Sequence, residues 1–117
     1  MYGAILGDMI GAPYEFDRGN KTKDFEMFND RVCFTDDSVM TIAVADALMR
    51  ISNDADDDDV KTAVIQSMQK WGKKYPRAGY GQRFFFWLGK NEYSCAVKPP
   101  FRDAGYRRSR DGVPQIV

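Results

Sequence analysis

The segment from Phe34 to Thr41, FTDDSVMT, places a hydroxyl and two adjacent carboxylates directly before an apolar run from Ile42 to Leu48. The apolar run predicts a buried, central helix over Ser38–Ile51, because apolar residues cover more than half of its circumference. Its acidic start allows two interpretations. It is typical of an N-cap followed by first-turn acidic residues that favour the helix dipole, and caps are common. Alternatively, the paired carboxylates bind a hard divalent cation such as Mg²⁺.

The residue types present restrict the chemistry that is available to this chain. Its 117 residues, 44% of them hydrophobic, are enough for one small folded domain. There is no histidine, so histidine zinc sites and Ser-His-Asp triads are excluded, and any chemistry must use carboxylates, hydroxyls, backbone groups or a bound metal. The two cysteines, Cys33 and Cys95, lack metal-ligand spacing.

Charge and hydropathy indicate where the protein works. Basic and acidic residues balance at 17 each, so no overall field attracts nucleic acid or a membrane surface. The first twelve residues lack a basic start and contain Asp8, unlike a signal peptide, and no apolar run is long enough to span a bilayer. We therefore expect a soluble cytoplasmic protein.

Glycines at positions 3, 7 and 11 share one face of a helix over Met1–Ala12, which Pro13 ends or bends. Each glycine costs about 1 kcal/mol in a helix relative to alanine, so the stripe needs a reason. A tight helix crossing and a face that lines a site are equally good reasons. Asp8 lies beside the stripe and is expected to be partly buried, which requires a partner for its carboxylate.

The rest of the first ninety residues predicts two more helices joined by loops. The helices are expected over Val60–Lys73, preceded by an acidic N-terminus that better fits the helix dipole than a calcium loop, and over Phe84–Leu88. The segment Asp17–Asp30 is interpreted as a loop pinned to the core by Phe25, Met27 and Phe28. The turn Tyr75–Gly81 is either a plain interhelical connection or a backbone cradle for an anion.

Residues 91–117 show no helical or strand period, contain Pro99-Pro100 and are rich in arginine. We therefore divide the chain into a helical domain over residues 1–90 and an irregular basic tail over 91–117. Nucleic-acid binding by this tail is the least favoured function, because it contains no recognised binding motif.

Three motifs in the chain resemble those of the ADP-ribosylglycohydrolase family, which includes the dinitrogenase-reductase-activating glycohydrolase. They are GAILGDMIGAPYEF at Gly3–Phe16, FTDDS at Phe34–Ser38, and Tyr75-Pro76 followed by AGYG at Ala78–Gly81. The motifs occur in the family's order, are specific in combination, and cover residues 2 to 89. The resemblance implies an all-α fold and the N-terminal portion of a helical domain with a binuclear magnesium site.

The resemblance also implies roles for individual residues. Thr35, Asp36 and Asp37 match metal ligands, with Asp36 also expected to be catalytic. Glu15 matches a glutamate on a mobile segment near the substrate and is the second expected catalytic residue. Substrate-binding positions are Gly79, Tyr80 and Gly81, and Asp8 matches a first-helix aspartate that supports the site from behind the ligands.

The implied activity is magnesium-dependent hydrolysis of the glycosidic bond between ADP-ribose and a protein side chain or small acceptor. Carboxylates suit this chemistry because the reaction passes through a cationic sugar. The family continues into an Asn-Ser-plus-glycine motif and an Asp-x-Asp-Thr motif that completes the metal pair, and neither is present in residues 91–117. We therefore expect a truncation or a shifted reading frame. The alternative function is an inactive remnant that binds ADP-ribose or metal, or that self-associates into a homo-oligomer through exposed apolar surface.

Overall fold

The computed structural model describes residues 1–16, 19 and 22–90, and these residues form helices and no strand. The elements in chain order are α1 (Tyr2–Gly11), the short 3₁₀ helix η1 (Ala12–Tyr14), α2 (Asp36–Arg50), α3 (Asp57–Lys74) and α4 (Gln82–Leu88). The all-α fold is therefore confirmed. The irregular basic tail expected over residues 91–117 lies outside the described residues.

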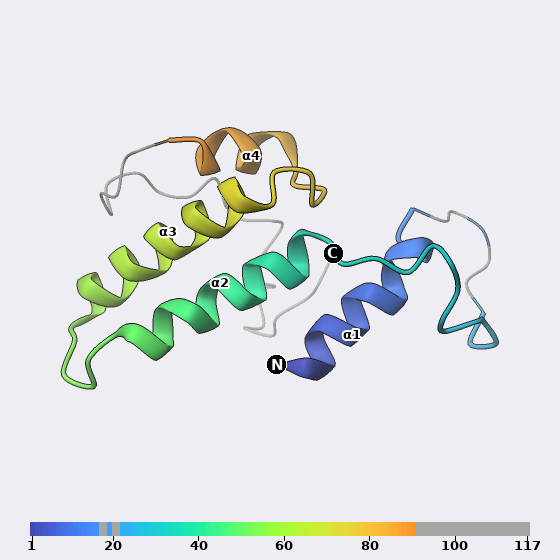
Figure 1. Cartoon of the computed structure of the whole chain (residues 1–117), viewed down its shortest axis with the longest axis horizontal. Helices are drawn as coiled ribbons and strands as arrows, with labels where there is room; N and C mark the ends of the chain where they lie inside the picture. The colour runs from blue at the N-terminus through green and yellow to red at the C-terminus, as the bar shows by residue number, and fades with distance from the viewer. Residues whose placement is uncertain (17–18, 20–21, 91–117) are drawn as a thin grey trace, which may run out of the picture.

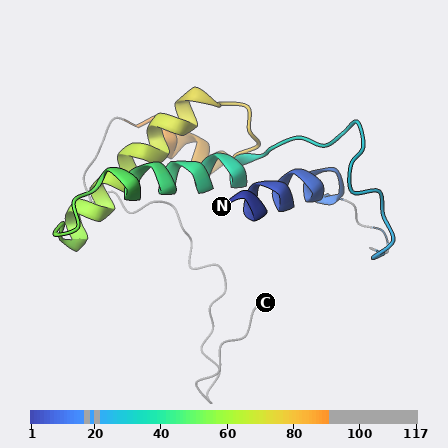
Figure 2. The same cartoon turned by 60° about the horizontal axis from the view of Figure 1, so that its bottom comes forward.

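Helix α2 lies between α1 and α3, and α4 packs across the C-terminal part of α3 (Figure 1). Residues 22–35, which lead into α2, extend away from the helices at one end of the molecule in both views (Figure 2). Within the described residues, no helix has both the length and the apolar content that crossing a bilayer requires.

Both long helices begin earlier than their apolar patterns indicate, because a side chain caps each of them. Thr35 is the N-cap of α2, and its hydroxyl accepts a hydrogen bond from the Asp37 amide. Asp56 is the N-cap of α3, and its carboxylate accepts from the Asp58 and Asp59 amides. Acidic residues then occupy the first turn of each helix, where the helix dipole favours negative charge.

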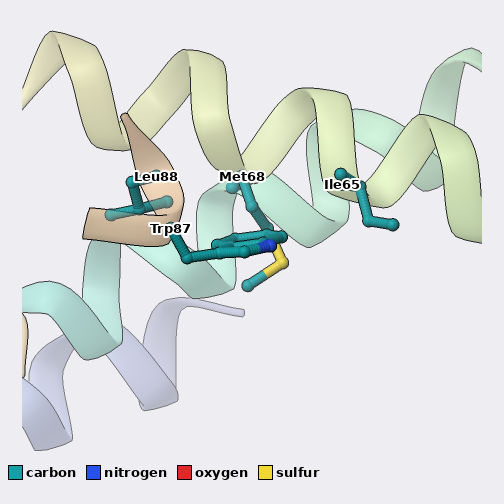
Figure 3. Packing of buried hydrophobic residues seen from close by; sticks show 5 residues of the cluster. Ile65, Met68, Trp87 and Leu88 are labelled. Carbon is teal, nitrogen blue, oxygen red and sulfur yellow. The ribbon is translucent and has the colours of Figure 1, made fainter. Parts of the chain in front are cut away.

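The core lies where α2, α3 and α4 meet. Its buried residues are Ala43, Ile65, Met68, Trp87 and Leu88. Figure 3 shows the Trp87 ring beside Met68, so the short helix α4 contributes the largest side chain of the core. Helix α2 is central as expected. Its buried face is narrower than the apolar pattern predicted, because Leu48 and Met49 are exposed. Self-association through such exposed apolar side chains stays a prediction.

Asp46 is a carboxylate within the otherwise apolar part of α2, and its hydrogen-bond partners explain why it occurs there. It accepts hydrogen bonds from Trp71 Nε1 at 3.1 Å and from Arg50 Nε at 2.8 Å. The Trp71 hydrogen bond, opposed by burial and assisted by the Arg50 hydrogen bond and charge, lowers the pKa of Asp46. This carboxylate therefore joins α2 to α3 and takes no part in the acidic site described below.

Gly72 is the point of closest approach between α3 and α4. A Cβ atom at this position would lie 2.7 Å from Leu88 Cδ1 and 2.8 Å from Leu88 Cδ2, and Leu88 is itself buried. We predict that Gly72→Ala lowers the free energy of unfolding by about 1 kcal/mol, because overpacking costs about 1–3 kcal/mol and the gain in helix propensity returns about 1 kcal/mol.

Urea denaturation would measure this change, with Gly3→Ala as the matched control. A Cβ atom at Gly3 meets no other atom within 4 Å, so the control is expected to keep or slightly raise stability. Equal stability of the two variants would contradict the close packing of α4 on α3.

Candidate acidic site

The Asp8 carboxylate joins α1 to the start of α2. Its Oδ1 accepts a hydrogen bond from Thr35 Oγ1 at 2.5 Å, and its Oδ2 accepts from the Thr35 amide at 2.8 Å. The same Oδ2 accepts from the Ser38 amide at 3.1 Å and from Ser38 Oγ at 2.5 Å. Asp8 therefore binds the two residues that immediately flank Asp36 and Asp37.

These hydrogen bonds decide the charge state of Asp8. Burial alone would raise the pKa of this half-buried carboxyl group, but the hydrogen bonds from Ser38 and Thr35 outweigh burial and lower the pKa below its ordinary value of 3.8. Asp8 is thus an ionised acceptor, and Thr35 and Ser38 are the partners of its partly buried carboxylate. Its role in supporting a metal site stays a prediction. The sequence had not assigned Ser38 a role, although its spacing of three from Thr35 places it in the same capping turn.

A cleft of about 470 Å³ opens between α1, the Glu15 end of η1 and the first turns of α2. Its lining residues are Ala4, Gly7, Asp8, Gly11, Ala12, Glu15, Asp37 and Thr41. The cleft therefore brings Asp8 and Glu15, from the first sixteen residues, together with Asp37 at the start of α2. Thr41 was not assigned by the sequence, but it follows Asp37 by one helical turn, and that spacing places both on one face.

The glycine stripe has no packing explanation among the described residues. A Cβ atom at Gly3, Gly7 or Gly11 would meet no other atom within 4 Å, so no helix crosses α1 closely at this face. Gly7 and Gly11 line the cleft instead. Of the two explanations that the sequence allowed, the tight crossing is wrong for the described residues, and the site-lining face agrees with the structure.

Asp36 faces the loop between α3 and α4 rather than the cleft wall. A Cβ atom at Gly79 would lie 3.7 Å from Asp36 Oδ1, and Gly79 has a φ of 101°, which favours glycine. Burial raises the pKa of Asp36, and the negative charges of Asp37, Glu15 and Asp8 raise it further, while a backbone hydrogen bond opposes them. Asp36 therefore lies among carboxylates that repel its charge.

Tyr80 follows Gly79 and packs against the core. Burial, and then the charge of Asp36, raise the pKa of the Tyr80 phenol, so the hydroxyl stays protonated near the acidic site. Its Oη is buried and has no hydrogen-bond partner among the described residues. Gly81 is the N-cap of α4 and is exposed. The turn at residues 75–81 connects α3 to α4 and passes beside Asp36.

The oxygen atoms of Asp36, Asp37 and their neighbours are of the kind that coordinates a hard cation. All are carboxylate or hydroxyl oxygens, and the Thr35 hydroxyl, which donates to Asp8 and accepts from the Asp37 amide, keeps one lone pair. Within residues 1–16, 19 and 22–90, no group of three or more Asp, Glu, Cys or His side chains is arranged to hold an ion. The oxygen atoms are thus of a suitable type for a hard cation, but the acidic side chains of the described residues do not form a complete set of ligands.

The described residues form helices and no strand, and their cleft is lined by carboxylates and contains no histidine. The protein is therefore an all-α protein with an acidic site. The family model for ADP-ribosylglycohydrolase matches residues 1–109. The chain therefore belongs to the ADP-ribosylglycohydrolase family. The match continues past residue 90 into a segment where no resemblance was evident from the sequence motifs. No curated protein and no solved structure matches the chain.

Membership supports a general class of activity. The family consists of hydrolases that are generally metal-dependent and act on ADP-ribosylated substrates. The three motifs that indicated the family from the sequence lie together in the structure, because Asp8 contacts Thr35 and Ser38, and Gly79 adjoins Asp36.

Proposed function

We propose that this protein takes part in magnesium-dependent hydrolysis of the glycosidic bond between ADP-ribose and a protein side chain or small acceptor. The observation that carries the proposal is the convergence of Glu15, Asp37 and the α1 glycine face on one cleft. Asp36 lies next to it, with a pKa raised by burial and by the charges of its neighbours. A bound cation would relieve that repulsion.

The residues of the cleft would act on different parts of the substrate. Gly7 and Gly11 leave room for a ligand to approach the α1 backbone, since no side chain of residues 1–16, 19 and 22–90 fills the space above them. The Glu15 and Asp36 carboxylates would stabilise the cationic sugar that forms as the glycosidic bond breaks. Gly79, Tyr80 and Gly81 would contact the ADP-ribose from the other side of Asp36.

Asp36, Asp37 and the remaining lone pair of Thr35 would hold the magnesium ion. When bound, the ion supplies orientation of the ribose hydroxyl groups and a lowered pKa for a water molecule. Asp8 would keep Thr35 and Ser38 in place on either side of the two carboxylates, through the four hydrogen bonds that it accepts. The chain itself therefore supplies positioning, negative charge and space.

We predict that the purified chain releases ADP-ribose from ADP-ribosyl-arginine or from O-acetyl-ADP-ribose in the presence of Mg²⁺, and that excess EDTA stops the release. Chromatography of the products measures the free ADP-ribose. Binding of ADP-ribose without release from either substrate would instead identify the alternative, a non-catalytic binding module. No release combined with magnesium affinity weaker than millimolar would contradict the proposal.

A further inference from the structure

Tyr14, the last residue of η1, makes contacts that the proposed activity does not use. Its hydroxyl donates a hydrogen bond to the Glu26 carbonyl at 2.8 Å and accepts one from Asn29 Nδ2 at 3.2 Å. Its ring meets Phe25 edge to face at a centroid distance of 5.2 Å, and the Arg31 guanidinium lies 5.9 Å from the ring centre. One side chain therefore contacts four residues of the loop over residues 22–33.

Apolar burial does not hold this loop on the helices. Phe25, Met27 and Phe28 were expected to pin the loop to the core, but their exposed fractions are 44%, 53% and 66%. The expectation is wrong because the described part of the loop extends beyond the end of the helices and so does not cross their core (Figure 1). Hydrogen bonds and the ring of Tyr14 take the place of a core contact.

The loop has enough internal structure to act as a unit. Asn29 Oδ1 accepts from the Arg31 amide at 2.9 Å, and the Asn29 carbonyl accepts from the Val32 amide at 3.2 Å. Asn29 Nδ2 also lies 3.4 Å from the Glu26 carbonyl, which is the acceptor of the Tyr14 hydroxyl. The Tyr14 hydroxyl therefore joins a network that already fixes the turn at residues 26–32.

Both ends of this part of the chain lead to the acidic site. Glu15 follows Tyr14 directly and lines the cleft, and Thr35 follows the loop and caps α2. The Glu15 carboxylate has no hydrogen bond or ion pair to any residue that the structure describes. Among the described residues, Glu15 makes a turn contact from its amide to the Ala12 carbonyl at 3.4 Å, so the path of the backbone around Glu15 affects where its carboxylate lies.

We propose that Tyr14 is a positioning residue that holds Glu15 at the acidic cleft by fastening the loop over residues 22–33 to η1. The role of Glu15 toward the substrate rests on the function proposed above, whereas the fastening of its backbone does not. The Tyr14 side chain does not line the cleft and acts through Glu15.

Tyr14→Phe removes only the hydroxyl and tests the proposal by two measurements on the full chain. The first is amide hydrogen exchange at Glu15 and over residues 22–33, which is expected to accelerate about fivefold, the equivalent of one lost hydrogen bond of about 1 kcal/mol. The second is the dissociation constant of ADP-ribose in Mg²⁺ by calorimetry, which is expected to rise about fivefold for the same reason. Tyr2→Phe is the matched control, because Tyr2 lies on α1 and is 84% exposed.

A double-mutant cycle with Glu15→Gln separates positioning from a purely structural role. If Tyr14 acts through Glu15, adding Tyr14→Phe to Glu15→Gln weakens ADP-ribose binding no further. Fully additive effects, or unchanged exchange at Glu15 in Tyr14→Phe, would overturn the proposal. If the unsubstituted chain binds no ADP-ribose, the proposed function fails, and the exchange measurement alone still decides whether Tyr14 holds Glu15.

Discussion

Replacing Asp8 by asparagine is expected to lower the free energy of unfolding by about 3 kcal/mol, because hydrogen bonds to a charged acceptor are each worth about 1.5–3 kcal/mol and a buried donor left without a partner costs more. The carboxylate accepts from both the amide and the hydroxyl of Thr35 and of Ser38. The asparagine side chain places an NH₂ group where one carboxylate oxygen accepted hydrogen bonds. This group cannot accept, so the N–H and O–H groups that donated to that oxygen lose their acceptor.

The effect is large because α1 packs on α2 without fully burying any of its own residues. None of its residues is buried, and its ten residues are fewer than an isolated helix needs to be stable in water. Loss of the Asp8 contacts is therefore expected to release α1 locally, before the core of α2, α3 and α4 unfolds. Hydrogen exchange would show this as faster exchange over residues 2–11.

The pH dependence has a definite sign. The pKa of Asp8 is lower in the folded chain than its ordinary value of 3.8, so the folded chain releases this proton more easily than the unfolded chain does. The stabilisation is therefore fully present above the unfolded pKa and is lost as the pH falls through the folded pKa. Asp8→Asn should remove this part of the acid sensitivity.

Urea denaturation of the variant between pH 7 and pH 3 measures both effects, with Asp24→Asn as the control. Asp24 is an exposed loop carboxylate, so its replacement is expected to change stability by less than about 0.5 kcal/mol. If the Asp8 variant matched this control, Asp8 would not be the tether of α1.

Local patterns were sufficient to predict the helices. The apolar pattern that includes Val39 and Ala43 predicted that α2 lies in the core, and both residues are buried. The starts of α2 and α3 were missed by two or three residues, because a cap is a hydrogen bond that a backbone amide donates to one side-chain oxygen, and it hardly alters the apolar period. Figure 1 shows the resulting arrangement, in which α2 lies between α1 and α3.

The candidate site could be predicted only in part. The family motifs indicated Asp8, Glu15 and the Thr35–Asp37 group, and all of them lie near one another. The role of Tyr14 could not be predicted, because its partners Glu26 and Asn29 are selected by the path of a loop that has no period. The exposure of Phe28 was missed for a related reason, since composition cannot show whether a loop crosses the core or leaves it.

The Asp36→Asn/Asp37→Asn variant is expected to lose both magnesium binding and any magnesium-dependent release of ADP-ribose. We expect the magnesium affinity to fall by on the order of 100-fold or more, because even groups that only orient metal ligands are worth 10–100-fold. An ion at 100 times its dissociation constant stabilises the protein that binds it by about 2.7 kcal/mol. Added Mg²⁺ should therefore raise the melting temperature of the unsubstituted chain and leave that of the variant unchanged.

Without metal, the same variant should lose little stability. The pKa of Asp36 is raised by burial and by neighbouring charges, so ionised Asp36 opposes folding above its unfolded pKa, and this penalty is relieved as the pH falls. Replacing it by asparagine removes the penalty, while the loss of negative charge at the N-terminus of α2 costs about 0.3–1 kcal/mol per residue. The two effects oppose each other.

Asp57→Asn/Asp58→Asn is the matched control for this experiment. Asp57 and Asp58 occupy the first two positions of α3 behind the cap Asp56, as Asp36 and Asp37 do in α2 behind Thr35. The control therefore loses the same helix-dipole interaction but leaves the cleft intact, and it should keep the response to magnesium. A magnesium response that survives in the Asp36/Asp37 variant, or disappears equally in the control, would show that the ion binds elsewhere or only through general screening of acidic helix ends.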